Sequence, residues 1–181
     1  MSGAPVFWFT GLSGAGKTTV AEAVKEWLEK QGYSVLILDG DDVRNRLHKH
    51  LDFNERDIKE NNFLICGLCL QYREEHDVIL VPIISPYAQS RRRARDRLGE
   101  GFYEIFFNAR LAIVAERDTK GLYAKAGRGE MDNMIGISSS TPYQPPTNPD
   151  LVIDTAAQSP ASAITAFKEF VVDKLAKKKM S

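Results

Sequence analysis

The chain has 181 residues, 43% of them hydrophobic, and its 24 basic and 24 acidic side chains cancel. This size and composition predict a single domain, 1–181, around one core, and the balanced charge argues against nucleic acid as a partner. No apolar stretch is long enough to cross a membrane, and no basic-then-apolar signal pattern precedes the apolar run Val6–Thr10. We therefore expect a cytoplasmic protein that contacts no membrane.

Short apolar runs, typical of parallel strands covered on both faces, alternate with helical patterns along the chain. The predicted strands are Val6–Thr10, Ser34–Leu38, Val78–Ile84, Phe102–Phe107 and Leu151–Ile153. The predicted helices are Thr18–Gln31, Asp42–His50, Glu55–Glu75, Gln89–Leu98 and Pro160–Lys178, with Gly32 ending the first and Ser159 capping the last. This alternation predicts an α/β fold with a doubly wound parallel sheet of about five strands, whose ligands bind beyond the carboxyl ends of the strands.

The loop after the first strand carries the most specific motif. Gly11-Leu12-Ser13-Gly14-Ala15-Gly16-Lys17-Thr18 fits G-x-x-x-x-G-K-[ST], the P-loop, and it lies between a predicted strand and a predicted helix. Glycines let the backbone N–H groups of such a loop surround a phosphate. We expect Lys17 to reach the β- and γ-phosphates of ATP and the Thr18 hydroxyl to hold Mg²⁺. The fold is thus predicted to be of the P-loop NTPase type.

An acidic cluster follows the second strand: Asp39, Asp41 and Asp42, with Arg44 close behind. Phosphoryl transfer to an alcohol uses a carboxylate to accept the hydroxyl proton or to help place Mg²⁺, and an arginine can hold an anionic substrate. The sequence leaves the choice of proton acceptor open between Asp39 and Asp41. Asp41 or Asp42 is also a candidate for capping the next helix.

No aspartate directly follows the third strand, where motors and many ATPases carry one, and this favours a small-molecule kinase. Five arginines come shortly afterwards, and most of them are expected on a solvated helix face rather than in a phosphate clamp: Arg91, Arg92, Arg93, Arg95 and Arg97. Cys66 and Cys69 lie three residues apart on a predicted helix, which favours core packing over redox chemistry. The histidines show no ligand spacing, so no zinc is expected.

Residues 120–148 interrupt the alternation with four glycines, three prolines and little apolar periodicity. A long irregular segment inside a compact domain is usually functional or mobile. Its place before the last strand predicts a lid over the bound nucleotide, and a disordered insertion is the alternative.

These motifs together resemble the adenylylsulfate (APS) kinase family from the P-loop to about Thr155. The resemblance rests on GLSGAGKTT at Gly11–Thr19, LDGDDVR at Leu38–Arg44, ISPY at Ile84–Tyr87, RDTKGLY at Arg117–Tyr123, and shorter matches at Gly136-Ile137, Pro142-Tyr143 and Pro145. It implies an enzyme that moves the γ-phosphate of ATP to the 3′-hydroxyl of adenosine 5′-phosphosulfate, giving PAPS. It also implies a small-molecule partner and, as in many family members, a homodimer.

The resemblance implies roles residue by residue. The P-loop with Thr19, and Arg117 and Arg128, would bind ATP, while Thr18 and Asp39 would hold Mg²⁺. Phe53 would stack on the substrate adenine, Ser85 would be a positioning hydroxyl, and Lys120 would offset charge on the transferring phosphates. The full set implied to bind the sulfonucleotide is Asp41, Asp42, Arg44, Phe53, Ile58, Asn61, Ile84, Ser85, Lys120, Leu122, Met134 and Ile135.

The departures from the family pattern lie on the acceptor side. Ile58 and Phe63 stand where the family usually has arginines facing the phosphosulfate or its neighbours. The usual lid Phe-Thr-Gly is Met134-Ile135-Gly136, and the lid arginine is displaced by one place to Arg128. Losing a charged contact to a dianion lowers affinity, since each is worth about 1.5–3 kcal/mol.

The leading hypothesis is therefore an APS kinase or an enzyme close to it. The nearest alternative is a kinase of the same fold that phosphorylates a different, less anionic hydroxyl compound, and Ile58 and Phe63 motivate it. A nucleotide switch is disfavoured because no N-K-x-D guanine-reading motif is present. A degenerate structural subunit would leave Lys17 and Thr18 without a role.

Overall fold

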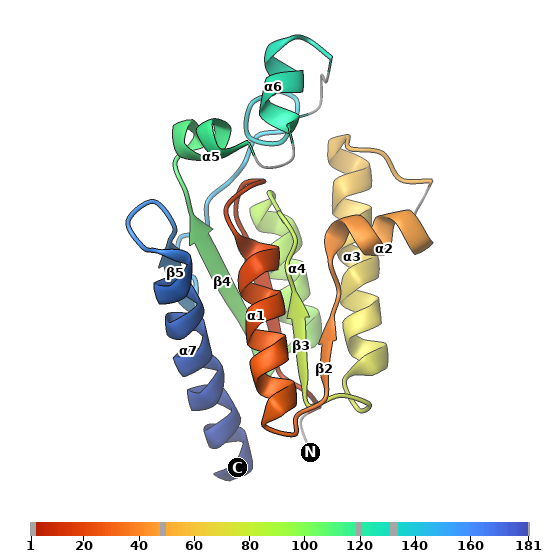
Figure 1. Cartoon of the computed structure of the whole chain (residues 1–181). Coiled ribbons are helices and arrows are strands. Elements are labelled where there is room, and N and C mark those ends of the chain that lie inside the picture. Colours follow the sequence, from red (N-terminus) through yellow and green to blue (C-terminus); the bar gives the residue numbers. More distant parts are fainter. Residues whose placement is uncertain (1–2, 48–49, 119–120, 131–133, 181) are drawn as a thin grey trace.

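The computed structural model describes residues 3–47, 50–118, 121–130 and 134–180. The described strands form one sheet, all parallel, in the order β2-β3-β1-β4-β5 (Figure 1). They are β1 (Val6–Thr10), β2 (Val35–Ile37), β3 (Val78–Val81), β4 (Phe102–Asn108) and β5 (Leu151–Asp154). The predicted doubly wound parallel α/β fold is confirmed.

Helices cover both faces of this sheet. They are α1 (Lys17–Lys30), α2 (Gly40–Leu47), α3 (Glu55–Tyr72), α4 (Ala88–Leu98), α5 (Leu111–Arg117), α6 (Leu122–Gly127) and α7 (Pro160–Met180). In Figure 1, α1 and α7 lie side by side on one face, and α3 and α4 lie behind the sheet. None of the helices in the described part of the chain is long and apolar enough to cross a membrane.

The sheet has an apolar core on each face, and the central strand β1 contributes side chains to both. Successive side chains of a strand point to opposite faces of the sheet. Phe7 and Phe9 belong to the core under α1 and α7, where both rings meet Phe167 edge-on. Val6 and Trp8 belong to the core under α3 and α4. This two-sided burial explains why β1 is a continuous apolar run rather than an alternating one.

Element boundaries differ from the predictions where local chemistry intervenes. The third strand ends at Val81 instead of Ile84, since Pro82 has no N–H to continue the ladder. The α2 helix begins at Gly40 and not at Asp42, because Asp39 is its cap: Asp39 Oδ1 accepts from the Asp41 and Asp42 N–H groups. The expectation that Asp41 or Asp42 caps α2 was therefore wrong. Gly32, with φ +87°, follows the end of α1, and Ser159 Oγ accepts from Ser162 N, both as predicted.

The region before β5 holds more regular structure than the sequence indicated. Two short helices, α5 and α6, were not predicted, and α6 falls within 120–148. Asp118 starts α6 by accepting from the backbone N–H groups of Tyr123 and Ala124 at 3.0 and 2.9 Å. Although desolvation opposes the shift, these backbone hydrogen bonds lower the pKa of Asp118. In Figure 1, α6 stands above the carboxyl ends of the strands.

The parallel strands bring three loops to one edge of the sheet. β1 leads into the P-loop, β2 into Asp39, and β3 into the Ile83–Ser85 turn. Because β3 lies between β2 and β1, these loops are neighbours in space, at the edge where open α/β sheets bind ligands.

Candidate active site

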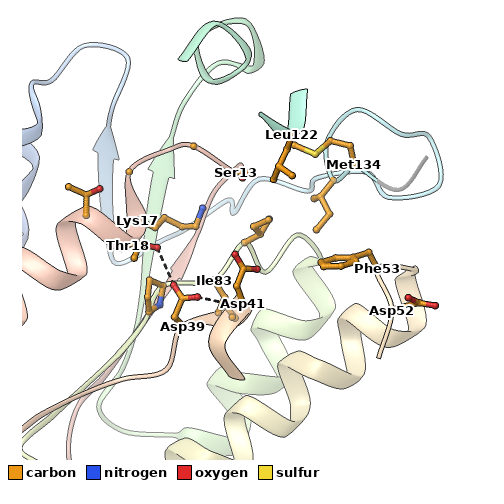
Figure 2. A pocket seen from close by; sticks show the side chains of 17 residues that line it. Ser13, Lys17, Thr18, Asp39, Asp41, Asp52, Phe53, Ile83, Leu122 and Met134 are labelled. Atoms are coloured by element: carbon orange, nitrogen blue, oxygen red, sulfur yellow. Dashed lines mark hydrogen bonds between the residues drawn. The ribbon is translucent and has the colours of Figure 1, made fainter. Parts of the chain in front are cut away.

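A pocket of about 530 Å³ opens at this edge. Figure 2 shows Lys17 and Thr18 on one side, Asp39 and Asp41 below, Phe53 opposite the P-loop, and Leu122 and Met134 above. The lining residues are Ser13, Gly14, Gly16, Lys17, Thr18, Thr19, Asp39, Gly40, Asp41, Asp52, Phe53, Pro82, Ile83, Ile84, Leu122, Met134 and Ile135. The pocket thus joins the P-loop to the predicted acceptor side, with room for more than a nucleotide phosphate.

The P-loop has the backbone that phosphate binding requires. Gly16 precedes α1 in a left-handed conformation, φ +86°, which side chains rarely adopt. Gly11 passes so close to β4 that a Cβ would lie 2.6 Å from the carbonyl oxygen of Phe107. The Lys17 Nζ donates to the carbonyl oxygens of Gly11 and Leu12 at 2.9 and 2.7 Å, so its ammonium lies over the loop that would carry the phosphates.

Asp39 connects the P-loop to the acidic cluster. Its Oδ2 accepts from the Thr18 hydroxyl at 3.1 Å, while its Oδ1 accepts from Asp41 N at 2.9 Å. A hydroxyl beside a carboxylate supplies the oxygen ligands that Mg²⁺ prefers, and Mg²⁺ usually completes its shell with waters and substrate phosphates. Within the described residues there is no group of three or more acidic, histidine or cysteine side chains that could hold a metal by itself. The Thr18–Asp39 pair fits a Mg²⁺ that arrives with ATP.

Arg44 is occupied by the loop that carries Phe53. Its guanidinium donates to the carbonyl oxygens of Leu51 and Asp52 and lies 4.3 Å from the centroid of the Phe53 ring. Burial lowers the pKa of this guanidinium, and the carboxylates of Asp41, Asp57 and Asp52 oppose the shift. The Phe53 side chain lines the pocket and is 46% exposed. The contact with Arg44 therefore helps to hold the Phe53 ring in its position.

Five of the predicted acceptor residues that the structure describes lie outside the pocket lining: Asp42, Arg44, Ile58, Asn61 and Ser85. Ser85 is 2% exposed, has φ +43°, and its Oγ accepts from the Trp8 indole N–H at 3.0 Å. Asn61 is buried on α3. Asp42, also predicted to bind substrate, is exposed and lies 3.9 Å from Arg46. Contact of Ser85 or Asn61 with a substrate stays a prediction that requires movement of its surroundings.

Comparison with known proteins identifies this arrangement. The chain matches the sequence profile described as adenylylsulphate kinase over residues 3–154. The chain belongs to the adenylylsulphate kinase family. The adenylyl-sulfate kinase of Halothermothrix orenii is 46% identical over 171 residues, which cover 92% of this chain and 89% of that protein. The adenylyl-sulfate kinase of Geotalea daltonii is 41% identical and covers 93% and 83%.

A solved structure of the family shows the same fold. The Mycobacterium tuberculosis APS kinase CysC, in complex with AMPPNP and APS, is 38% identical, superposes with a TM-score of 0.85, and covers 97% of this chain and 99% of its own. Structures under 25% identical extend the fold further, among them a Sinorhizobium meliloti gluconokinase at 17% and a TM-score of 0.56.

The departures from the family pattern fall in two different places. Ile58 is 4% exposed and packs in an apolar cluster with Tyr87 and the lid residue Ile135. Phe63 lies on the outer side of α3, 38% exposed and under the guanidinium groups of Arg93 and Arg97. The expectation that Phe63 replaces a cation facing the acceptor is not supported by this position, whereas Ile58 lies close to the lid wall of the pocket.

The segment predicted to be a lid contacts the P-loop through its described residues. The Tyr123 hydroxyl donates to the carbonyl oxygen of Ser13 at 2.8 Å, and Leu122, Met134 and Ile135 line the pocket. Arg117 donates to the carbonyl oxygen of Thr155, and Arg128 pairs with Glu130, so neither predicted ATP ligand faces the pocket. Lys120, predicted at the lid, lies outside the described residues.

The sequence did not reveal the buried polar network under the pocket. The carbonyl oxygen of Ile84 accepts from Gly11 N at 3.2 Å and from the Thr10 hydroxyl at 2.9 Å. The same Thr10 hydroxyl lies 2.9 Å from the hydroxyl of Tyr143, whose pKa burial raises to about 12. The Pro142-Tyr143 match was the signal for this contact, but its partner could only be seen in the fold.

Proposed function

We propose that this protein transfers the γ-phosphoryl group of ATP to the 3′-hydroxyl of adenosine 5′-phosphosulfate. The observation that carries the proposal is the pocket of about 530 Å³ in which the P-loop, Asp41 and Phe53 face a common space. The chain superposes on a family member solved with AMPPNP and APS, which supports the same pair of ligands here. We propose that residues 1–181 form a single P-loop kinase domain.

The ATP side uses the P-loop and the Thr18–Asp39 pair. Backbone N–H groups at the start of α1 hold the phosphates, and Lys17 exchanges its bonds to Gly11 and Leu12 for bonds to the β- and γ-phosphates. Thr18 and Asp39 would hold the Mg²⁺ of MgATP, which would supply positive charge beside the transferring phosphoryl group. Arg117 and Arg128 would join the nucleotide only after a rearrangement, because they bind Thr155 and Glu130 in this structure. The role of Lys120 at the transferring phosphates stays a proposal that follows from the family resemblance.

Asp41 is the proposed proton acceptor. Asp39 and Asp41 both line the pocket. Asp39 accepts a hydrogen bond from Thr18 with one oxygen and from the start of α2 with the other, whereas Asp41 lies in the first turn of α2. Positioning and electrostatic stabilisation carry most of phosphoryl transfer, so Asp41 orients the acceptor hydroxyl and takes its proton. Phe53 offers its face to the acceptor base, and Ile84 lies against it.

The test is ADP release from MgATP with APS as acceptor, measured for the native chain and for Lys17→Ala and Asp41→Ala. APS-dependent turnover that is lost in both variants supports the proposal. Binding of ATP with no APS-dependent turnover would reject it. A nucleotide titration of the Asp41→Ala variant separates loss of chemistry from loss of ATP binding.

One observation favours a second acceptor class. Among the described residues that line the pocket, Lys17 is the single cation, while Asp39, Asp41 and Asp52 are acidic. The acceptor side therefore suits a nucleotide-linked hydroxyl compound with less negative charge than APS. Running the same assay with APS and with adenosine-containing acceptors that lack the sulfate distinguishes the classes by their kcat/KM.

We propose that the protein is a homodimer. A hexameric APS kinase from Thiobacillus denitrificans, 26% identical over 98% of this chain and 30% of its own, supports assembly from more than one copy and not the number of copies. Sedimentation of the purified protein measures the assembly. A cytoplasmic location is supported by the use of ATP.

A further inference from the structure

A second cavity, of about 280 Å³, lies between α3 and α4 and shares no lining residue with the active-site pocket. We call it the α3–α4 groove. Its lining residues are Lys59, Asn62, Phe63, Cys66, Ser90, Arg93, Ala94, Asp96 and Arg97. Nothing in the proposed kinase reaction uses these side chains.

Two arginines of the groove, Arg93 and Arg97, lie over the ring of Phe63. The guanidinium groups of Arg93 and Arg97 lie 5.2 and 4.5 Å from the centroid of Phe63, and Arg97 also donates to the Phe63 carbonyl oxygen at 3.4 Å. In the described ranges of the chain, no carboxylate comes within ion-pair distance of either arginine. Lys59 pairs with Glu55 at 2.6 Å, and Asp96 is the one acid among the lining residues. Two positive charges therefore remain without a negative partner.

Asn62 supplies the second observation. It is 4% exposed, it lines the groove, and its amide nitrogen Nδ2 has no hydrogen-bond partner. Buried amide groups are almost always hydrogen-bonded, because leaving one unpaired is unfavourable. An acceptor oxygen in the groove would satisfy this donor, and the nearby arginines would favour an oxygen that carries negative charge.

We propose that the α3–α4 groove binds a compact oxyanion, a phosphate or sulfate group that is either free or carried by a nucleotide. Asn62 Nδ2 donates to one of its oxygens, and Arg93 and Arg97 supply the compensating charge. The groove is below the size of most pockets for whole organic ligands, which favours a small anionic group over a complete nucleotide. The proposal does not depend on which acceptor the kinase phosphorylates.

The experiment follows the side-chain amide signal of Asn62 by NMR while inorganic phosphate, sulfate or AMP is added. Saturating MgAMPPNP occupies the P-loop, so that anion binding there does not contribute. Adenosine, which lacks the phosphate, is the negative arm. A saturable shift with phosphate or sulfate but not with adenosine is expected, and a stronger response to AMP identifies the nucleotide-borne group as the source.

Three variants make the test specific. The double variant Arg93→Gln with Arg97→Gln is expected to lower the affinity of the groove for the anion by about tenfold or more, since charged hydrogen bonds are lost. Arg92→Gln removes one positive charge from an exposed position of α4 outside the groove, and should leave the affinity unchanged. Asn62→Leu should raise the unfolding temperature without anion and remove the increase that phosphate gives to the native chain.

Equal affinity in the double variant and in Arg92→Gln would overturn the proposal. So would the absence of any shift at Asn62 up to the phosphate concentration that perturbs exposed amides. A change of sedimentation coefficient in the double variant, without anion binding in the native chain, would also overturn it and would make the groove a contact between copies.

Discussion

The carboxylates of Asp39 and Asp41 lie two residues apart but occupy different environments. Both line the pocket, but Asp39 accepts hydrogen bonds from the Thr18 hydroxyl and from the start of α2, whereas Asp41 lies in the first turn of α2. Asp41→Asn should lower kcat by about a hundredfold or more with little change in the KM for ATP, since a general base is lost. Asp39→Asn should instead raise the KM for MgATP by about tenfold, because a charged oxygen at the metal is lost.

Steady-state kinetics of both variants, with unfolding temperatures as a check on the fold, measure this split. An Asp41→Asn enzyme with native kcat would assign the proton to another acceptor. Equal effects of both substitutions on kcat and on the KM for ATP would mean that the two carboxylates act as one unit.

Ile58 is the residue whose replacement tests the acceptor side. It packs with Tyr87 and Ile135, and the family resemblance places an arginine at this position. Ile58→Arg should lower the KM for APS by about tenfold if APS binds in this pocket, since one charged hydrogen bond is worth about 1.5–3 kcal/mol. It should also lower the unfolding temperature, because the cluster around it is apolar.

Phe63→Arg is the control for this change. It adds the same charge to the same helix at an exposed position outside the active-site pocket, and the KM for APS should not respond. A lower KM in both variants would mean that long-range charge, and not a contact at position 58, improves binding.

At the scale of elements, the lid and the P-loop meet at Gly136. Its φ is +85°, and a Cβ would lie 2.5 Å from Leu12 Cδ2 in the P-loop. Gly136→Ala should cost about 1–2 kcal/mol for the left-handed backbone alone. It should also raise the KM for ATP several-fold, because the new methyl group pushes on Leu12.

Gly129→Ala is the matched control for Gly136→Ala. Gly129 has φ +70°, and nothing lies within 4 Å of its added Cβ. The two variants should therefore lose similar stability, while only Gly136→Ala changes the KM for ATP, as measured by urea unfolding and nucleotide titration. Equal KM values would show that the lid contact does not affect nucleotide binding.

The elements predicted from sequence were those whose signal is local. Apolar runs and the P-loop fixed all strands of the described sheet, and Gly32 and Ser159 marked helix ends through their own backbone chemistry. The short α5 and α6 helices escaped prediction because each is held by tertiary contacts, such as the bond from Tyr123 to Ser13, rather than by apolar periodicity. The side to which Phe63 points also depended on the packing of α3 against α4, which the motif spacing does not contain.

The five arginines after the third strand illustrate the same limit at the scale of the whole molecule. A solvated face was expected for most of them, and Arg92, Arg93 and Arg97 are exposed. Arg91 is 3% exposed, because it shares the inner face of α4 with Ala94 and Leu98. The helical spacing of Arg91, Ala94 and Leu98 can be recognised in the sequence. The carboxylate and carbonyl oxygens that accept hydrogen bonds from Arg91 come from segments distant in the sequence, so spacing alone could not predict them.

Arg91 joins four parts of the molecule through one guanidinium. From α4, it donates to Glu104 Oε1 on β4 at 2.6 Å, to the carbonyl oxygen of Ser85 after β3 at 2.7 Å, and to that of Gln144 in the segment leading to β5 at 2.7 Å. Arg91→Met would leave the buried Glu104 carboxylate with only Arg95, 3.7 Å away. Breaking a buried pair by removing one partner costs about 3–5 kcal/mol.

For a protein of this size, such a loss lowers the unfolding temperature by about 10 °C. Arg92→Met, on the exposed side of the same helix, should stay within about 0.5 kcal/mol of the native chain. The double variant Arg91→Met with Glu104→Leu should recover part of the loss, because it removes the uncompensated charge. Calorimetry of these variants distinguishes the outcomes: equal stability of Arg91→Met and Arg92→Met would mean that the sheet, and not the guanidinium, holds the Ser85 turn and the segment around Gln144 in place.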